Sequence, residues 1–172
     1  MSLTIVDFNN FWSPSGGGVR RYHLEKMNFY RYETDAVYVF VMPDSRTYTE
    51  QLTDSLIIEH VKAFKFPGKW EYRMLWKSSQ IAPILKRHKP DIIEVGSPYI
   101  LPTVVRKNAK KIVPRAKLLG FWHADFPITY VERPIAEKFG KKLGKLASQV
   151  AFAYARYEFK GFTGIQVSAE ET

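Results

Sequence analysis

The sequence predicts a single α/β domain built on a doubly wound, mainly parallel sheet with helices on both faces. Short apolar runs rich in β-branched and aromatic residues alternate along the chain with segments of helical spacing. Several of these runs are apolar at successive positions, as strands are when both faces of a parallel sheet are covered. The 172 residues, 45% of them hydrophobic, suffice for one core and are too few for two large ones. We therefore expect one Rossmann-like domain over residues 1–172.

The expected elements follow in order along the chain. Strands are predicted in 3–11, 35–43, 55–64, 90–98, 116–125 and from 164 onward. Helices are predicted over 19–32, 70–89, 99–112 and 134–162, where apolar residues recur at three- and four-residue spacing. Pro83 is expected to start or kink the later part of the second helix. The apolar stripe of the longest helix consists of Leu143, Leu146, Val150, Tyr154 and Tyr157.

Three consecutive glycines, Gly16, Gly17 and Gly18, stand where the first strand gives way to a helix. A tight turn with a positive φ requires one glycine rather than three, so we interpret the run as backbone that a ligand approaches closely. Bare N–H groups at the positive end of a helix suit a phosphate. The dinucleotide pattern G-x-G-x-x-G is not met, because Arg21 stands where its third glycine would be, and the phosphate-loop pattern is absent.

Two later segments are expected at the same edge of the sheet as the glycines. His123 closes one predicted strand and is followed by Asp125, and residues 96–98 close another. Parallel strands end at one edge, where ligands bind in folds of this class. At such an edge a neutral imidazole can donate or accept a hydrogen bond to a sugar hydroxyl or a phosphate. The other histidines pair with no carboxylate at metal-ligand spacing, so no metal site is predicted.

Composition narrows the classes of function. The chain has no cysteine, which excludes disulfides and thiolate sites and favours a reducing, cytoplasmic setting. No segment approaches the roughly 18 uninterrupted apolar residues of a membrane span. The formal net charge is +9, from 26 Lys and Arg against 17 Asp and Glu. This excess favours an anionic partner, namely nucleotide phosphates, nucleic acid or an acidic membrane surface.

Four segments taken in order resemble the N-terminal half of a retaining glycosyltransferase of family 4. They are GGVRR (17–21) after the first strand, PDIIEVGSPY (90–99), FWHADFPITYVERP (121–134) and IQVSAEET (165–172). The resemblance covers nearly the whole chain and implies one half of the GT-B fold, the half that mainly holds the acceptor. The basic pair and the E-x7-E element that hold the nucleotide-sugar in this family belong to a second domain. No such domain follows Thr172, so the resemblance implies a domain that is catalytically incomplete alone.

The resemblance also assigns roles to residues. The donor diphosphate is assigned to Gly16, Gly17, Gly18 and Arg21, catalysis to His123 and Asp125, and the acceptor to Ser97, Pro98 and Tyr99. The histidine is expected to bond the donor sugar, and the aspartate to orient the histidine or the acceptor. The implied partners are a nucleotide-sugar donor and a carbohydrate or lipid-linked acceptor. No metal or other cofactor is implied.

Two alternatives belong to other classes. A Rossmann-type oxidoreductase or nucleotide-sugar-modifying enzyme would need a third glycine near Arg21 and an acid ending the second strand, where only Asp44 is available. A nucleic-acid-binding module would interleave basic and aromatic residues on one face. Here the aromatic residues fall largely on predicted core stripes, so no nucleic-acid partner is expected.

The lysines in the first half of the longest predicted helix allow two arrangements. Lys141, Lys142 and Lys145 stand beside Leu143 and Leu146. If the leucines are exposed, this basic face suits an anionic membrane, and the protein would be peripheral at the inner face of the plasma membrane. If the leucines pack inward, the lysines are merely solvated.

Overall fold

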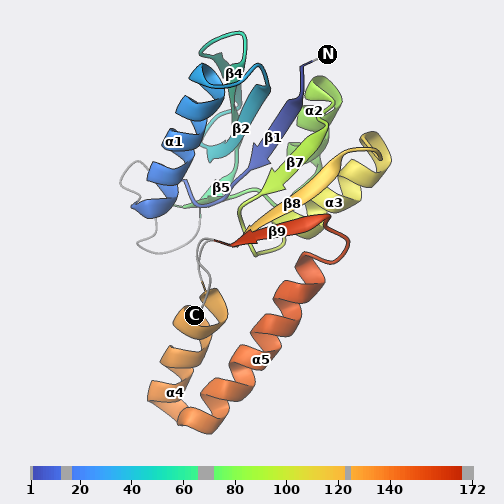
Figure 1. Ribbon diagram of the computed structural model, residues 1–172. Coiled ribbons are helices and arrows are strands. Elements are labelled where there is room, and N and C mark those ends of the chain that lie inside the picture. The colour runs from blue at the N-terminus through green and yellow to red at the C-terminus, as the bar shows by residue number, and fades with distance from the viewer. Residues whose placement is uncertain (1, 13–16, 66–71, 123–124, 168–172) are drawn as a thin grey trace.

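The computed structural model describes residues 2–12, 17–65, 72–122 and 125–167 and shows the predicted fold class. One 7-stranded sheet has the order β3-β4-β2-β1-β7-β8-β9, and every neighbouring pair in it is parallel except β3 and β4 (Figure 1). Its strands are β1 (Thr4–Phe8), β2 (Val37–Asp44), β3 (Tyr48–Gln51), β4 (Leu56–Lys62), β7 (Ile92–Val95), β8 (Lys117–Trp122) and β9 (Gly164–Val167). A small antiparallel pair consists of β5 (Phe64–Lys65) and β6 (Arg73–Met74). The last predicted strand extends into 168–172, which lie outside the described residues.

The chain leaves β1 in one direction and later returns to its other side. From β1 it builds outward through β2 and β4, and it then crosses back to add β7, β8 and β9 beside β1. The strand order therefore reverses between β1 and β7. In open parallel sheets this point of reversal is where the loops at the carboxyl ends diverge and ligands bind.

Helices cover both faces of the sheet, which makes it doubly wound (Figure 1). The helices are α1 (Gly18–Tyr32), α2 (Ser78–His88), α3 (Leu101–Ile112), the π-helical segment η1 (Pro127–Glu132), α4 (Arg133–Phe139) and α5 (Lys141–Glu158). Because side chains alternate along a strand, Val6 and Phe8 pack in the core under α2 and α3, whereas Ile5 packs with Met27 of α1.

The second helix begins later in the chain than the sequence predicts. The helix begins at Ser78, and residues 73–74 form strand β6, while 66–71 lie outside the described residues. The Gln80 side chain accepts hydrogen bonds from the backbone N–H groups of Trp76 and Lys77, which closes the first turn. Pro83 lies inside this helix rather than at its start.

The longest predicted helix is divided into a hairpin. The chain turns at Gly140, whose φ of 92° is a left-handed value that favours glycine, and α5 then runs back along α4. Small residues allow the close approach: a Cβ on Gly144 would lie 2.7 Å from the Ala136 methyl carbon. Ser148 donates a hydrogen bond to Glu132 across the same interface. Figure 1 shows the hairpin extending away from the sheet.

The predicted apolar stripe of that helix is therefore not the face that it buries. The buried residues of α5 are Gly144, Ser148, Ala155 and Glu158, whereas Leu143, Leu146, Val150 and Tyr157 are exposed. The expectation that Leu143 and Leu146 pack inward is therefore wrong, because both side chains are exposed. None of the helices in the described ranges is both long and apolar enough to cross a bilayer.

Candidate functional site

Three loops meet at the carboxyl edge of β1, β7 and β8, on both sides of the strand reversal. Gly17 and Gly18 open α1 after β1, Ser97–Tyr99 follow β7, and Asp125 follows β8. These strands are neighbours and parallel, so the three segments share one edge. Gly16 and His123 lie outside the described residues.

The start of α1 offers an open helix end. Gly17 and Gly18 are exposed, neither has a positive φ, and a Cβ built on either would meet nothing within 4 Å. Packing within the described chain therefore does not require glycine at either position. Among the described residues no side chain caps the helix, and its first turn contains no acid, so the positive end of its dipole is not neutralised by any of them.

Two arginines stand in this first turn. Arg21 is exposed, and its side chain is free to reach a ligand at the helix start. The Arg20 guanidinium lies 5.9 Å from the Trp12 ring centroid, and its buried Nε has no hydrogen-bond partner among the described residues. The helix start therefore combines an open dipole with two cations.

The loop after β7 is packed into the fold. Ser97 and Pro98 are buried, and the Ser97 hydroxyl accepts the N–H of Tyr99 at 3.5 Å, so only half-buried Tyr99 reaches the surface. Ile100 has a φ of 55°, which a β-branched residue rarely adopts, and its N–H donates to the Tyr154 hydroxyl at 3.0 Å. The hairpin thus holds this strained turn in place.

Asp125 carries an unsatisfied oxygen. Its Oδ1 is buried and has no hydrogen-bond partner among the described residues. Its backbone carbonyl accepts the N–H of Thr129 at 2.9 Å, an α-helical bond at the start of the segment that leads into η1. A buried carboxylate oxygen without a donor is uncommon in folded proteins, and it marks this position as one that a ligand or a neighbouring side chain completes.

A line of aromatic rings joins the three loops, and sequence reasoning did not anticipate it. Phe11 lies 5.8 Å from Tyr72 and 5.9 Å from Tyr99, centroid to centroid. Tyr99 lies 5.0 Å from Phe126, which lies 5.4 Å from Trp122. The available signal was that Phe11 ends a predicted strand and that Tyr99 and Phe126 each directly follow one, whereas Trp122 and Tyr72 gave no such signal. The two contacts of Phe11 are edge-to-face, a geometry that stabilises by about 0.5–1.5 kcal/mol for each pair beyond burial.

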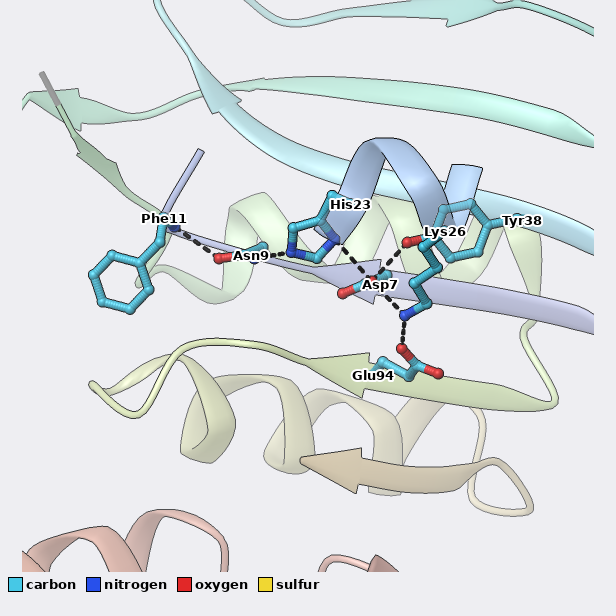
Figure 2. A network of polar contacts seen from close by, with 7 residues as sticks. All are labelled: Asp7, Asn9, Phe11, His23, Lys26, Tyr38 and Glu94. Carbon is cyan, nitrogen blue, oxygen red and sulfur yellow. Dashed lines mark hydrogen bonds and ion pairs between the residues drawn. The ribbon is translucent and has the colours of Figure 1, made fainter. Parts of the chain in front are cut away.

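Behind this edge lies a buried ionic network centred on Asp7 (Figure 2). Lys26 of α1 lies 2.8 Å from the Asp7 carboxylate and also pairs with Glu94 of β7. The Tyr38 hydroxyl donates to the same Asp7 oxygen at 2.6 Å. Asp7 is 2% exposed and Lys26 11% exposed, so α1 is tied to β1 and β7 through a charge cluster that water scarcely reaches.

The charges in the network depend on one another. Burial alone would raise the pKa of the Asp7 carboxyl, but the Lys26 ammonium and His23 outweigh burial and hold it well below its usual range. Burial would likewise lower the pKa of Lys26, and the two carboxylates raise it instead. The pKa of Glu94 is raised by burial and by the Asp7 charge, despite Lys26.

The same network fixes the tautomer of His23. Phe11 donates its N–H to Asn9 Oδ1 at 2.7 Å, which turns the Asn9 amide nitrogen toward His23 Nε2 (Figure 2). This orientation of the amide makes Nε2 the acceptor and so assigns the ring proton to Nδ1, which lies 3.5 Å from Asp7 and has no hydrogen-bond partner among the described residues. A Cβ on Gly96 would lie 3.0 Å from the Asn9 amide nitrogen, so glycine leaves the space that this amide occupies.

No group of three or more His, Asp or Glu side chains within the described part of the chain is placed to hold a metal ion. No protein-family model matches the sequence, and the search of curated proteins returned no match. The arrangement at the sheet edge therefore has to be interpreted from its own chemistry: an open helix end with cations, an unsatisfied carboxylate and a row of aromatic rings.

Proposed function

We propose that this chain is the acceptor-side, N-terminal half of a retaining glycosyltransferase of the GT-B type, which takes its sugar from a nucleotide-sugar. One observation carries the proposal. The segments that resemble the family, at 17–21 and 90–99 and in the described parts of 121–134, come from separate parts of the chain and lie at the carboxyl edge of β1, β7 and β8.

The proposed roles follow the chemistry of each group. The open N–H groups of Gly17 and Gly18, with Arg21 beside them, suit the negative charge on a departing nucleoside diphosphate. The free oxygen of Asp125 suits a hydrogen bond from His123 or from an acceptor hydroxyl. In the reaction the acceptor oxygen replaces the diphosphate oxygen at the anomeric carbon on the same face. A cytoplasmic setting fits a nucleotide-sugar donor.

The environment of Asp44 disfavours the oxidoreductase alternative. An acid that ends the second strand of a dinucleotide-binding fold bonds the ribose hydroxyls. Here Asp44 Oδ2 lies 2.8 Å from His60 Nδ1, and Oδ1 accepts hydrogen bonds from Ser45. Both carboxylate oxygens are thus engaged within the protein.

Calorimetry and amide NMR with UDP- and GDP-sugars and with NAD test the proposal. We expect weak nucleotide-sugar binding or none detectable by calorimetry, because the diphosphate clamp is expected in another domain. Small amide shifts at high ligand concentration should include Gly17 and Gly18. Sub-micromolar binding of a nucleotide-sugar would refute the assignment of the donor site, and tight binding of NAD would favour the oxidoreductase.

The variant Gly18→Val sharpens the test, because a Cβ there meets no described atom within 4 Å and the fold should tolerate it. It should abolish the nucleotide-induced shifts while leaving the thermal midpoint nearly unchanged. Asn28→Val, on the exposed face of the same helix, is the matched control and should leave the shifts intact. Shifts that persist in Gly18→Val would exclude a ligand at the helix start.

A further inference from the structure

A cavity of about 520 Å³ lies at the amino edge of the sheet, opposite the edge where the three loops of the candidate site meet. It is bounded by the second half of α3, the turn that leads into β8 and the loop between α5 and β9 (Figure 1). β8 and β9 begin beside it, at Lys117 and Gly164, whereas the candidate site lies where β1, β7 and β8 end. Sites for small molecules have volumes of about 300–1,000 Å³, so this cavity is large enough for a ligand of its own.

Part of the lining is apolar and rigid. The apolar lining residues are Ala109, Val113, Pro114, Ala116 and Leu118. Ala109 and Leu118 also belong to the core between the sheet and its helices, and such close-packed side chains change position little. The loop before β9 is tied to the same strand, because the Thr163 N–H donates to the Leu118 carbonyl at 2.7 Å and the Thr163 hydroxyl accepts the Leu118 N–H at 3.4 Å. The shape of the cavity is therefore set by the fold itself.

The charged part of the lining is basic. It consists of Arg106, Lys107, Lys110 and Lys160, and among the described residues no acid lines the cavity. Between Glu94 and Asp125 the sequence contains six Lys and Arg and no acid. Lysines in the last turn of α3 stabilise the negative end of the helix dipole and need no ligand. Arg106 stands earlier in the helix and Lys160 comes from a different segment, so the dipole does not explain why these cations share one cavity. Their mutual repulsion favours a bound anion.

Arg106 is positioned by hydrogen bonds and is thus prepared for a ligand. Its Nη1 donates to the Lys160 carbonyl, and its Nη2 donates to the Thr103 hydroxyl at 3.4 Å. The loop turns beside it at Gly161, whose φ of 81° is a left-handed value that favours glycine. A guanidinium has five N–H donors, and these two bonds leave three of them for a ligand. An oriented guanidinium matches the oxygens of a phosphate or a carboxylate better than a mobile ammonium does.

We propose that this cavity binds a small organic phosphate, with the phosphate at Arg106, Lys110 and Lys160 and an aromatic body against Val113 and Leu118. A phosphate monoester carries about two negative charges on its oxygens, which suits several cations at once, whereas a single carboxylate would leave most of them uncompensated. The apolar lining favours an organic ester over inorganic phosphate, because an aromatic group that covers this lining is itself removed from water. The site lies at the opposite edge from the one proposed for sugar transfer, and it does not depend on that function.

Amide NMR of the full chain, titrated with adenosine monophosphate and with ribose 5-phosphate, tests the proposal. The two probes carry the same phosphate and differ by the aromatic base. We expect saturable shifts at Lys110, Leu118 and Gly161 with both probes, and about tenfold tighter binding of the nucleotide, because only the base covers the apolar lining. Equal affinities for the two probes, or no binding of either, would overturn the proposal. Shifts at Gly17 and Gly18 alone would place the nucleotide at the candidate site instead, so a failure here is distinguishable from a failure of the proposed function.

Charge variants separate a defined site from a general attraction of anions. Lys110→Gln combined with Lys160→Gln should weaken nucleotide binding about tenfold for each lysine removed, and the fold should tolerate both changes because the two side chains are exposed. The matched control, Lys138→Gln with Lys141→Gln, removes the same charge at exposed positions of the hairpin and should weaken binding by less than about twofold. Arg106→Lys, which keeps the charge but loses the planar pair of donors, should also weaken binding. Equal losses in the two double variants, or an unchanged affinity in Arg106→Lys, would contradict the proposed phosphate contacts.

Discussion

Removing the Lys26 ammonium should be among the most damaging single changes in this fold. The change Lys26→Met keeps the length and apolar character of the side chain and removes its charge. Asp7, 2% exposed, and Glu94, 14% exposed, then face each other without the cation that separates them. Their Cα positions are paired in register on neighbouring strands, so neither carboxylate can move away without disturbing the sheet.

The expected magnitude follows from this burial. Breaking a buried ion pair on one side costs about 3–5 kcal/mol, because the remaining charge is left uncompensated. We expect a loss of about 3 kcal/mol, near the lower limit, since the Tyr38 hydroxyl still donates to Asp7. For a chain of 172 residues this lowers the thermal midpoint by roughly 10 °C. Urea unfolding followed by circular dichroism, with thermal scans, measures both quantities.

The loss should depend on pH with a defined sign. In the native protein the pKa of Asp7 is held below its usual range, so its contribution is complete above about pH 4 and declines as pH falls through the folded-state value. In Lys26→Met, burial and the Glu94 charge should raise the pKa of Asp7, so the variant binds a proton on acidification and its deficit narrows toward about pH 4. Adding Asp7→Asn should recover part of the loss at neutral pH. A cost below about 1 kcal/mol, or a deficit that does not change with pH, would refute this account of the network.

Three further changes test the packing. Gly144→Val should destabilise the hairpin by about 1–3 kcal/mol and speed amide exchange in α4 and α5, because the new Cβ would lie 2.7 Å from the Ala136 methyl carbon. Unchanged amide exchange would contradict the observed contact between the two helices. Lys89→Gly should stabilise the protein by about 1 kcal/mol in urea unfolding, because Lys89 has a φ of 44°, and a destabilised variant would argue against this cap. Gly120→Ala should cost about 1–3 kcal/mol, because its Cβ would lie 2.7 Å from the Phe159 ring, and Phe159→Leu should restore part of that loss in the double variant.

The parallel sheet could be predicted because its strands are buried on both faces. A run such as VYVFV at 37–41 is apolar throughout, and that pattern requires covering layers on either side. The shared edge of the three loops then follows from parallel direction alone. The donor and acceptor roles of the residues at that edge remain predictions.

The hairpin and the ionic network could not be predicted with the same tools. Periodicity identifies the apolar stripe of a helix, but it does not show whether that stripe or a row of small residues packs on the neighbouring helix. In α5 the small residues Gly144 and Ser148 make this contact. Gly140 alone divides the segment, and one glycine in a helical pattern is ambiguous. Asp7 did give a signal, as an acid inside an apolar strand, but its partners Lys26 and Tyr38 lie 19 and 31 residues away in sequence and only the tertiary fold brings them together.

Lys26 ties the middle of α1 to the sheet, and this bears on the anion site that we propose at the start of the helix. The Lys26 ammonium pairs with Asp7 of β1 and Glu94 of β7, two adjacent central strands. A shift or tilt of α1 would therefore strain these ion pairs or displace the strands. If an anion binds at Gly17 and Gly18 as we propose, it would meet donors whose positions are already set, and little conformational entropy would be lost on contact. The same stiffness would limit the range of anions that fit, because the helix could not adjust to a poorly matched one.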